Sequence, residues 1–245
     1  MFSILIINKD DEQIKDTLES LVQTNVFRQA EVIVIDSSNH KLDWIKKQFP
    51  QVKWFAFKHS GHKKITIPEQ RNLSLRKASG DILVFLDASC VPTAKNWLTN
   101  LTRPITKEGE KIVRGTLSNT DNYVSVTQQS GEKIYVTESP TINMAVARDV
   151  FDQIGGFDES FSYGSDMDFS WRATHHGYKI RYVQDAPVSH NFGDTGQNMK
   201  RYMRYGQARA KLYFNHAACS PPGLSALPHS GVPALSLAAQ VDWKE

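Results

Sequence analysis

Residues 3–38 read SILIINKDDEQIKDTLESLVQTNVFRQAEVIVIDSS, and this stretch indicates the class of fold. The unbroken apolar run Ser3–Ile7 is typical of a buried strand, and Glu31–Ile35 is a second, β-branched run of the same kind. Between them, apolar residues recur at the spacing of one helix face, at Ile14, Leu18, Leu21 and Val22. Two strands joined by a helix are expected to be parallel neighbours, because a parallel pair needs a crossover connection.

The alternation of strands and helices continues as far as Asp87. We expect a helix over Leu42–Phe49, a strand over Val52–Phe57, a helix over Pro68–Ser79 with Gly80 as its C-terminal cap, and a strand over Ile82–Leu86. The sequence therefore predicts an α/β fold in which a mostly parallel central sheet is flanked by helices. Ligands of such sheets bind at the carboxyl ends of the strands.

The second half of the chain is less regular. It contains one clear helical pattern over Asp166–His176, and its strand candidates are Lys111–Thr116, Ile134–Val136, Thr141–Ala147 and Lys179–Val183. From about Ala217 the composition changes to Ala, Ser, Pro and Gly without a helical or strand period, which is typical of a loosely ordered segment.

Composition and charge exclude several classes of protein. With 40% hydrophobic and 22% charged residues the chain is an ordinary globular protein, and its net charge of +3 is too small to favour nucleic acid as the main partner. Cys90 and Cys219 have neither disulfide-framework nor zinc-site spacing. No apolar run is long enough to span a bilayer, and the N-terminus lacks a secretory signal, so we expect a cytoplasmic protein.

Carboxylates follow two of the predicted strands directly. Asp36 and Asp87 each lie at the rim of the sheet, where a ligand can reach them, although acidic residues also simply begin loops, and for Asp36 the two interpretations are equally good. Ser89 follows Asp87 by two residues, and such an oxygen pair can share one hard cation such as Mg²⁺ or Mn²⁺.

The start of the predicted helix at residue 166 has two interpretations. Ser165 can cap the helix, and Asp166 and Asp168 suit the positive end of its dipole. Alternatively the preceding loop GGFDESFSYG, residues 155–164, delivers the helix start into a cleft, where a carboxylate can accept a proton from a hydroxyl group.

Basic residues and one histidine leave further alternatives open. Arg71 can serve a pyrophosphate or a structural carboxylate, and His190 alone says little. Residues 199–214 are rich in Lys, Arg and Tyr, which fits a solvated helix, a clamp over an anionic leaving group, or a contact with anionic lipid.

Taken in order, these segments resemble the family 2 glycosyltransferases of the GT-A fold, over roughly Ser3–His190 and less clearly to about Phe214. The matching segments are SILIINKDDEQIKDTLESL, VIVIDSS, RNLSLRKASGDILVFLDAS, GGFDESF, SDMDFSWR and APVSH. The resemblance implies a catalytic domain over residues 1–215, with a nucleotide-binding half at 1–110 and an acceptor-side half at 111–215. That domain ends in a C-terminal helical extension, and residues 216–245 form a loosely ordered tail.

The resemblance also implies a role for individual residues. Asp36 would recognise the nucleotide base, Asp87 the metal-bound diphosphate, and Asp166 would be the general base. The full set of implied donor-binding residues is Ile7, Asn8, Asp36, Arg71, Asp87 and Ala88, and the implied metal ligands are Asp87, Ser89 and His190. Two departures stand out: Ser89 replaces the second aspartate of the usual Asp-x-Asp motif, and Ser165 replaces the usual glutamate before the catalytic aspartate.

The implied reaction is a single displacement with inversion. Asp166 would deprotonate an acceptor hydroxyl as it attacks the anomeric carbon of a nucleotide sugar, with UDP as the expected nucleotide and Mn²⁺ or Mg²⁺ as the expected cofactor. The acceptor would be a saccharide, a lipid-linked molecule or another hydroxyl compound, with no nucleic acid as partner. A peripheral contact with the inner face of the membrane stays open.

Two other functions compete with this one. A nicotinamide-dependent oxidoreductase also begins with alternating strands and helices, but the first turn here, NKDDEQ, lacks the glycines that bring a backbone close to pyrophosphate. A non-catalytic sugar-nucleotide-binding relative is the second, and Ser89 is its main support.

Overall fold

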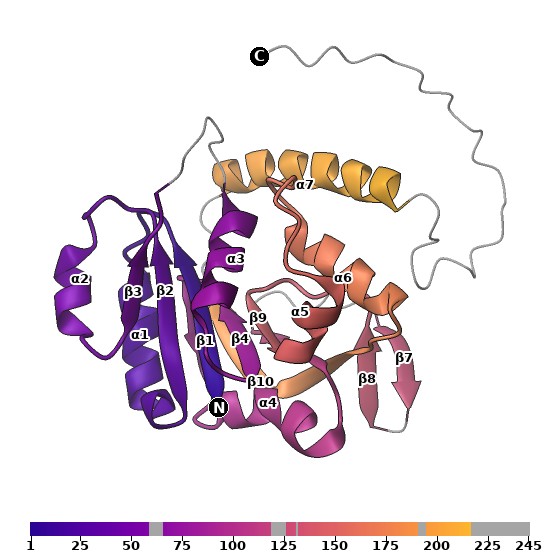
Figure 1. Cartoon of the computed structure of the whole chain (residues 1–245), viewed down its shortest axis with the longest axis horizontal. Helices are drawn as coiled ribbons and strands as arrows, with labels where there is room; N and C mark the ends of the chain where they lie inside the picture. The colour runs from indigo at the N-terminus through magenta and orange to yellow at the C-terminus, as the bar shows by residue number, and fades with distance from the viewer. Residues whose placement is uncertain (59–65, 119–125, 131, 191–194, 217–245) are drawn as a thin grey trace, which may run out of the picture.

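One sheet organises the chain in the computed structural model, which describes residues 1–58, 66–118, 126–130, 132–190 and 195–216 (Figure 1). The strand order is β3-β2-β1-β4-β9-β6-β10-β8-β7, and the short strand β5 pairs with β10 beside this path. Helices cover both faces of the sheet, so the α/β class predicted from the sequence is confirmed.

The first half of the chain forms the parallel part of the sheet. Its strands β1, β2, β3 and β4 pair in parallel in the order β3-β2-β1-β4. Its elements are β1 (Phe2–Asn8), α1 (Ile14–Gln23), the 3-10 turn η1 (Val26–Arg28), β2 (Ala30–Asp36), α2 (Asp43–Gln48), β3 (Lys53–Ala56), α3 (Ile67–Lys77) and β4 (Ile82–Leu86).

The second half adds strands of both directions. Strand β9 is antiparallel to β4 and β6, and β10 is parallel to β6, so that β10 runs in the same direction as β1 to β4. The elements are β5 (Cys90–Pro92), α4 (Trp97–Glu108), β6 (Ile112–Leu117), β7 (Val126–Ser130), β8 (Lys133–Val136), β9 (Asn143–Ala147), α5 (Arg148–Ile154), α6 (Ser165–His175), β10 (Ile180–His190) and α7 (Thr195–Asn215).

Alternating side chains of the strands build two cores. Ile4 and Ile6 of β1 face α1, α2 and α4, whereas Leu5 between them faces the layer of α5 and α6. The unbroken apolar runs of β1, β2 and β4 follow from this arrangement, because both faces of these strands are buried.

Several local expectations are wrong. Gly80 is not a helix cap: α3 ends at Lys77, and the amide of Gly80 donates to Ser3 Oγ at 2.8 Å. Val22 lies on α1 but is 44% exposed, because it falls outside the stripe formed by Ile14, Leu18 and Leu21. Ser165 is the first residue of α6 and makes no cap bond there, since Gly164 occupies the cap position with φ +77°.

The sequence pattern did not predict helices α4 and α5, and the strand that it predicted over Lys179–Val183 is shorter than β10. Helix α4 contains Pro104, and a proline in a helix interior usually argues against a helix. Helix α5 has only seven residues and directly follows β9. Strand β10 extends beyond the expected end at Val183, through an irregularity between Val183 and Val188, as far as His190. The expected tail at 216–245 lies outside the described residues except for His216.

Candidate active site

The carboxyl ends of the parallel strands bring together residues that are distant in sequence. Asn8 and Asp36 are the last residues of β1 and β2 and are directly paired in register, and Asp87 follows the last residue of β4. Because β10 runs in the same direction, its last residue, His190, lies at this edge too. We call Asn8, Asp36, Asp87 and His190 the strand-end residues.

Asp36 is buried and already bonded. Its side chain is 2% exposed, its Oδ2 lies 2.9 Å from Lys46 Nζ, and its Oδ1 accepts a hydrogen bond from the amide of Ser38 at 3.0 Å. Burial opposes the charge on Lys46, but the bonds to Asp36 and Asp43 outweigh it and raise the pKa of Lys46. Both carboxylate oxygens of Asp36 therefore already have a partner within the protein.

Asn8 organises the loop after β1. Its side-chain amide donates to the carbonyl of Asp11 at 2.9 Å, and its Oδ1 accepts from the amide of Asp11 at 3.1 Å. The amide of Asp10 in turn donates to Ser38 Oγ at 2.7 Å, which ties this loop to the one after β2. The two loops form one unit beside Asp36.

The segment Asp87-Ala88-Ser89 is a tight turn between β4 and β5. The amide of Cys90 donates to the carbonyl of Asp87 at 3.1 Å, and Thr17 of α1 donates its hydroxyl to the carbonyl of Ala88 at 2.6 Å. The backbone of the turn is thereby fixed from both sides, while the side chains of Asp87 and Ser89 stay partly accessible.

Antiparallel pairing of β5 with β10 places His190 opposite this turn. His190 pairs in register with Cys90, and its Nε2 lies 3.2 Å from Ser89 Oγ. The carboxylate of Asp87, the hydroxyl of Ser89 and the imidazole of His190 form a mixed oxygen and nitrogen set that suits Mn²⁺ better than a soft metal. Among the described residues no group of three or more His, Cys, Asp or Glu side chains is placed to hold a metal ion, so a cation here would need further oxygens from its ligand or from water.

Arg71 connects the strand-end residues with the start of α6. Together with Ile7 and Asp87 it lines a small pocket beside the ends of β1 and β4. Its side chain is buried, lies over the ring of Phe157, and donates from Nη1 to Ser165 Oγ at 3.2 Å. The two halves of the chain therefore meet at Arg71 and Ser165.

Asp166 follows Ser165 in the first turn of α6 and is half-buried. Its Oδ1 accepts from the amide of Met167 at 3.0 Å, and its carbonyl accepts from Ser170 Oγ at 2.8 Å. The loop before it is held by Asn72 of α3, whose amide group bonds to both the carbonyl and the amide of Phe157 at 2.8 and 2.9 Å. The carboxylate is thus presented by a helix start whose position is fixed from α3.

The sequence pattern missed Glu138 and the ion pair that it forms near Asp166. Glu138, in the connection between β8 and β9, accepts from Trp171 Nε1 of α6 at 2.7 Å and forms an ion pair with Arg209 of α7. Arg209 belongs to the basic segment noted in the sequence, but nothing in the sequence indicated its partner, because 71 residues separate the pair.

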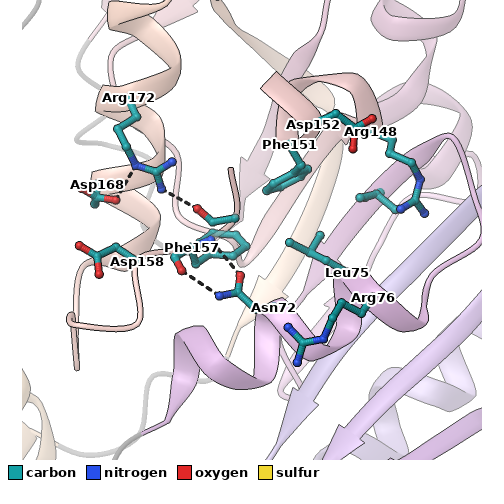
Figure 2. A pocket seen from close by; sticks show the side chains of 12 residues that line it. Asn72, Leu75, Arg76, Arg148, Phe151, Asp152, Phe157, Asp158, Asp168 and Arg172 are labelled. Carbon is teal, nitrogen blue, oxygen red and sulfur yellow. Dashed lines mark hydrogen bonds and ion pairs between the residues drawn. The ribbon is translucent and has the colours of Figure 1, made fainter. Parts of the chain in front are cut away.

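A cavity much larger than the pocket beside Arg71 lies elsewhere. It measures about 670 Å³ and opens between α3, α5 and α6 (Figure 2). Arg148, Arg172 and Asn72 line it with their side chains bonded mainly to backbone carbonyls, and neither Asp87 nor Asp166 belongs to its wall. We therefore assign the candidate site to the strand ends.

Comparison with known proteins identifies the family of this chain. Residues 3–165 match the family described as glycosyl transferase family 2, and residues 108–236 match glycosyl transferase family group 2. The chain belongs to glycosyl transferase family 2. The prediction of a glycosyltransferase is therefore confirmed at the level of the family.

Relatives of this family 2 chain agree with that assignment. Glycosyltransferase AglE of Haloferax volcanii is 26% identical over 227 residues, which cover 86% of this chain and 73% of AglE. The solved mannosyltransferase PcManGT from Pyrobaculum calidifontis, in complex with GDP-Man and Mn²⁺, has a TM-score of 0.70 at 17% identity and matches 89% of this chain. GalNAc-T7 with UDP, GalNAc and Mn²⁺ has a TM-score of 0.66 at 19% identity and matches 95% of this chain.

These likenesses confirm the GT-A type of fold. This family 2 chain spans 64% of the length of the PcManGT chain and 52% of that of the GalNAc-T7 chain. At such low identity the solved structures establish the fold alone.

Proposed function

We propose that this chain transfers a sugar from a nucleotide-sugar donor to an acceptor hydroxyl, with inversion at the anomeric carbon. The observation that carries the proposal is the hydrogen bond from Arg71 to Ser165. It joins the strand-end residues, where a donor would lie, to the helix start that bears Asp166. Residues 1–110 would then form the donor half and residues 111–215 the acceptor half.

The donor would lie along the carboxyl ends of β1, β2 and β4. Its diphosphate would contact Arg71 and the turn at Asp87 and Ala88, and Ile7 and Asn8 would border the nucleoside. Asp36 would lie beside the nucleotide base, whose recognition the resemblance assigns to it. Its bonds to Lys46 and Ser38 would fix the position of its carboxylate. UDP is the proposed nucleotide, and the relatives in complex with GDP-Man and with UDP make both nucleotides worth testing.

Asp87, Ser89 and His190 would hold a divalent cation, Mn²⁺ or Mg²⁺. When bound, the cation would neutralise negative charge that grows on the departing diphosphate. Ser89 supplies a neutral hydroxyl where the family usually has a second carboxylate, so we propose that the donor's phosphate oxygens complete the coordination. Support comes from the mixed donor set and from the Mn²⁺ present in PcManGT and GalNAc-T7.

Asp166 would take the proton of the acceptor hydroxyl as its oxygen attacks the anomeric carbon. The bond from that carbon to the diphosphate oxygen breaks in the same step, and the nucleoside diphosphate leaves. General-base help of this kind contributes about 10² to 10⁴ in rate. The half-buried position of Asp166 in the first turn of α6 would leave it within reach of an acceptor.

The acceptor would be a saccharide, a lipid-linked molecule or another hydroxyl compound, and helix α7 supports a contact with a membrane surface. Met203 and Phe214 are 65% and 83% exposed on its outer face, and its sequence contains five basic residues and no acidic one: Lys200, Arg201, Arg204, Arg209 and Lys211. An apolar stripe with cationic neighbours is the pattern of an interfacial helix. Among the described residues no helix is long and apolar enough to cross a bilayer.

The experiment that tests the function is a comparison of binding and release. A panel of UDP-glucose, UDP-N-acetylglucosamine and GDP-mannose, with and without Mn²⁺, is screened by thermal shift, because a ligand of the folded state raises the melting temperature. Release of nucleoside diphosphate is then measured for the wild type, for Asp166→Asn and for Asp152→Asn as an exposed control.

We expect Asp166→Asn to keep donor binding and to lose release by about 10² to 10⁴. Wild-type release in Asp166→Asn would remove Asp166 from the role of base. Donor binding without nucleotide release in the wild type, even with acceptor present, would favour a non-catalytic sugar-nucleotide binder. The replacement of the motif's second aspartate by Ser89 also fits that alternative.

A further inference from the structure

Helix α7 packs directly on the helix start that carries Asp166. Arg204 donates to the hydroxyl of Tyr163 at 2.8 Å, and Lys211 Nζ donates to the carbonyl of Ser160 at 2.7 Å. Ala208 lies so near Gly164 that a methyl group on this glycine would come within 3.2 Å of its Cβ. The loop before Asp166 is therefore covered by α7, which crosses one end of the molecule (Figure 1).

A bidentate ion pair joins Arg209 of α7 to Glu138. Both ends of the guanidinium are engaged: Nη1 bonds to Oε1 and Nη2 to Oε2, the latter at 3.1 Å. Such a bidentate pair fixes orientation as well as distance. Because Glu138 Oε1 also accepts from Trp171 Nε1 at 2.7 Å, one carboxylate locks α7 to α6.

The connection that carries Glu138 reaches the first turn of α6 by a second route. The amide of Ser139 donates to Ser170 Oγ at 3.1 Å, and the same hydroxyl donates to the carbonyl of Asp166 at 2.8 Å. A displacement of Glu138 would thus be transmitted to Asp166 through two hydrogen bonds.

Arg209 also lies in the electrostatic field of Asp166. Burial opposes its charge, but the bond to Glu138 outweighs this and raises the pKa of Arg209, with smaller contributions from Tyr213 and Asp166. Its side chain is 39% exposed, so the guanidinium is not enclosed and a ligand could reach it.

We propose that Arg209, oriented by Glu138, is a positioning residue for Asp166 and the acceptor hydroxyl, which makes α7 part of the acceptor side of the site. The proposal rests on the proposed function of Asp166 as general base. It assigns the inner face of the basic segment to the site and leaves the outer face, with Met203 and Phe214, for other contacts. Misplacement of a reacting group by about 1 Å can lower a rate by about 10².

The test uses four variants of the full chain and a control. Arg209→Gln removes the charge, Arg209→Lys keeps it without the fork, Glu138→Gln removes its partner's charge, and the double variant Glu138→Arg/Arg209→Glu reverses the pair. Gln207→Ala, an exposed neighbour on α7, is the control. The readouts are UDP binding with Mn²⁺, release of UDP from UDP-N-acetylglucosamine, release of GDP from GDP-mannose, and hydrogen exchange of residues 160–170.

We expect Arg209→Gln to bind UDP within about twofold of the wild type, to release nucleotide about 10²-fold more slowly, and to exchange faster over residues 160–170. Arg209→Lys should release nucleotide at a rate between those of the wild type and Arg209→Gln. Gln207→Ala should release it at the wild-type rate. The reversed pair should regain thermal stability but not release, because it places a carboxylate beside Asp166.

Two results would overturn the inference: full release by Arg209→Gln, or full release by the reversed pair, which would reduce the pair to a structural contact. If the wild type releases no nucleotide from either donor, the proposed function fails, and the inference that rests on it fails too. If the wild type releases nucleotide and Arg209→Gln releases it equally fast, the inference alone fails, even where residues 160–170 exchange faster in the variant.

Discussion

Ser89 Oγ lies 3.2 Å from His190 Nε2, although 101 residues separate them in sequence. The short strand β5 begins directly after Ser89 and pairs antiparallel with the last residues of β10, so the sheet itself fixes this contact. Asp87 with a hydroxyl and an imidazole carries less negative charge than the two carboxylates of an Asp-x-Asp motif would. At the proposed cation site, the strength of binding would therefore depend on the residue at position 89.

Substitution of Ser89 should change the cation requirement in a defined direction. Ser89→Asp adds a carboxylate at the proposed site and should lower the Mn²⁺ concentration for half-maximal thermal shift by UDP on the order of tenfold, because affinity follows ligand charge. His190→Ala should raise it by about tenfold or more. Thr93→Ala, exposed at the other end of β5, is the control. An unchanged Mn²⁺ dependence in both variants would contradict the assigned ligands.

Arg71 should contribute to donor affinity. Arg71→Met keeps an apolar stem over Phe157 but removes the charged donor, so UDP affinity measured by calorimetry should fall about 10- to 100-fold, the usual effect of losing a charged hydrogen bond. Arg76→Gln, an exposed arginine on the same helix that lines the larger cavity, should leave UDP affinity unchanged. Equal losses of UDP affinity in Arg71→Met and Arg76→Gln would indicate a general effect of positive charge and not a direct contact between Arg71 and UDP.

The outer face of α7 should bind anionic membranes if the proposed contact exists. Met203→Ser/Phe214→Ser should lower cosedimentation with phosphatidylglycerol vesicles by about tenfold, because two exposed apolar side chains no longer insert. Wild-type chain should bind neutral phosphatidylcholine vesicles less than anionic ones. Equal binding of wild type and variant to anionic vesicles would argue against insertion of this face.

The sequence predicted the first half of the fold well because its signals are local. In β1, β2 and β4 both faces are buried, so the strands contain unbroken apolar runs. An acid marks the end of two of them, since Asp36 is the last residue of β2 and Asp87 follows β4. Parallel connection then places Asn8, Asp36 and Asp87 at one edge without any further information.

The remainder depends on contacts that no local pattern contains. His190 meets Ser89 only because β10 continues past an irregularity at Val183, and Glu138 meets Arg209 only because α7 packs on α6. Helix α4 was not predicted because it contains Pro104, although Leu98, Leu101 and the residues around them follow helical spacing. Such pairings are decided by tertiary packing, which overrides local propensity.

Glu31 should make the stability of the chain depend on pH below 5. Burial alone would raise its pKa, but bonds from Lys53, Ser3 and Ser79 outweigh it and lower the pKa from 4.5 to about 2. The ionised form is thus favoured in the folded state, so its contribution of about 3 kcal/mol is complete above pH 4.5 and is lost as the pH falls towards 2. Urea unfolding of Glu31→Gln from pH 5 to pH 2 should show a flatter profile than the wild type. Glu19→Gln, in an exposed pair with Lys15, should follow the wild type.

Gly164 should be needed for two separate reasons, and a matched glycine separates them. Gly164 and Gly109 both have φ +77°, so alanine at either position should lower the free energy of unfolding by about 1–2 kcal/mol. Nothing lies within 4 Å of a methyl group at Gly109, whereas at Gly164 it would meet Ala208 of α7. Gly164→Ala should therefore also displace α7 from the helix start and slow nucleotide release on the order of tenfold, while Gly109→Ala should keep wild-type release. Chemical denaturation and release assays on the two variants measure the two effects separately, and equal release by both would show that the packing of α7 on Gly164 has no part in the reaction.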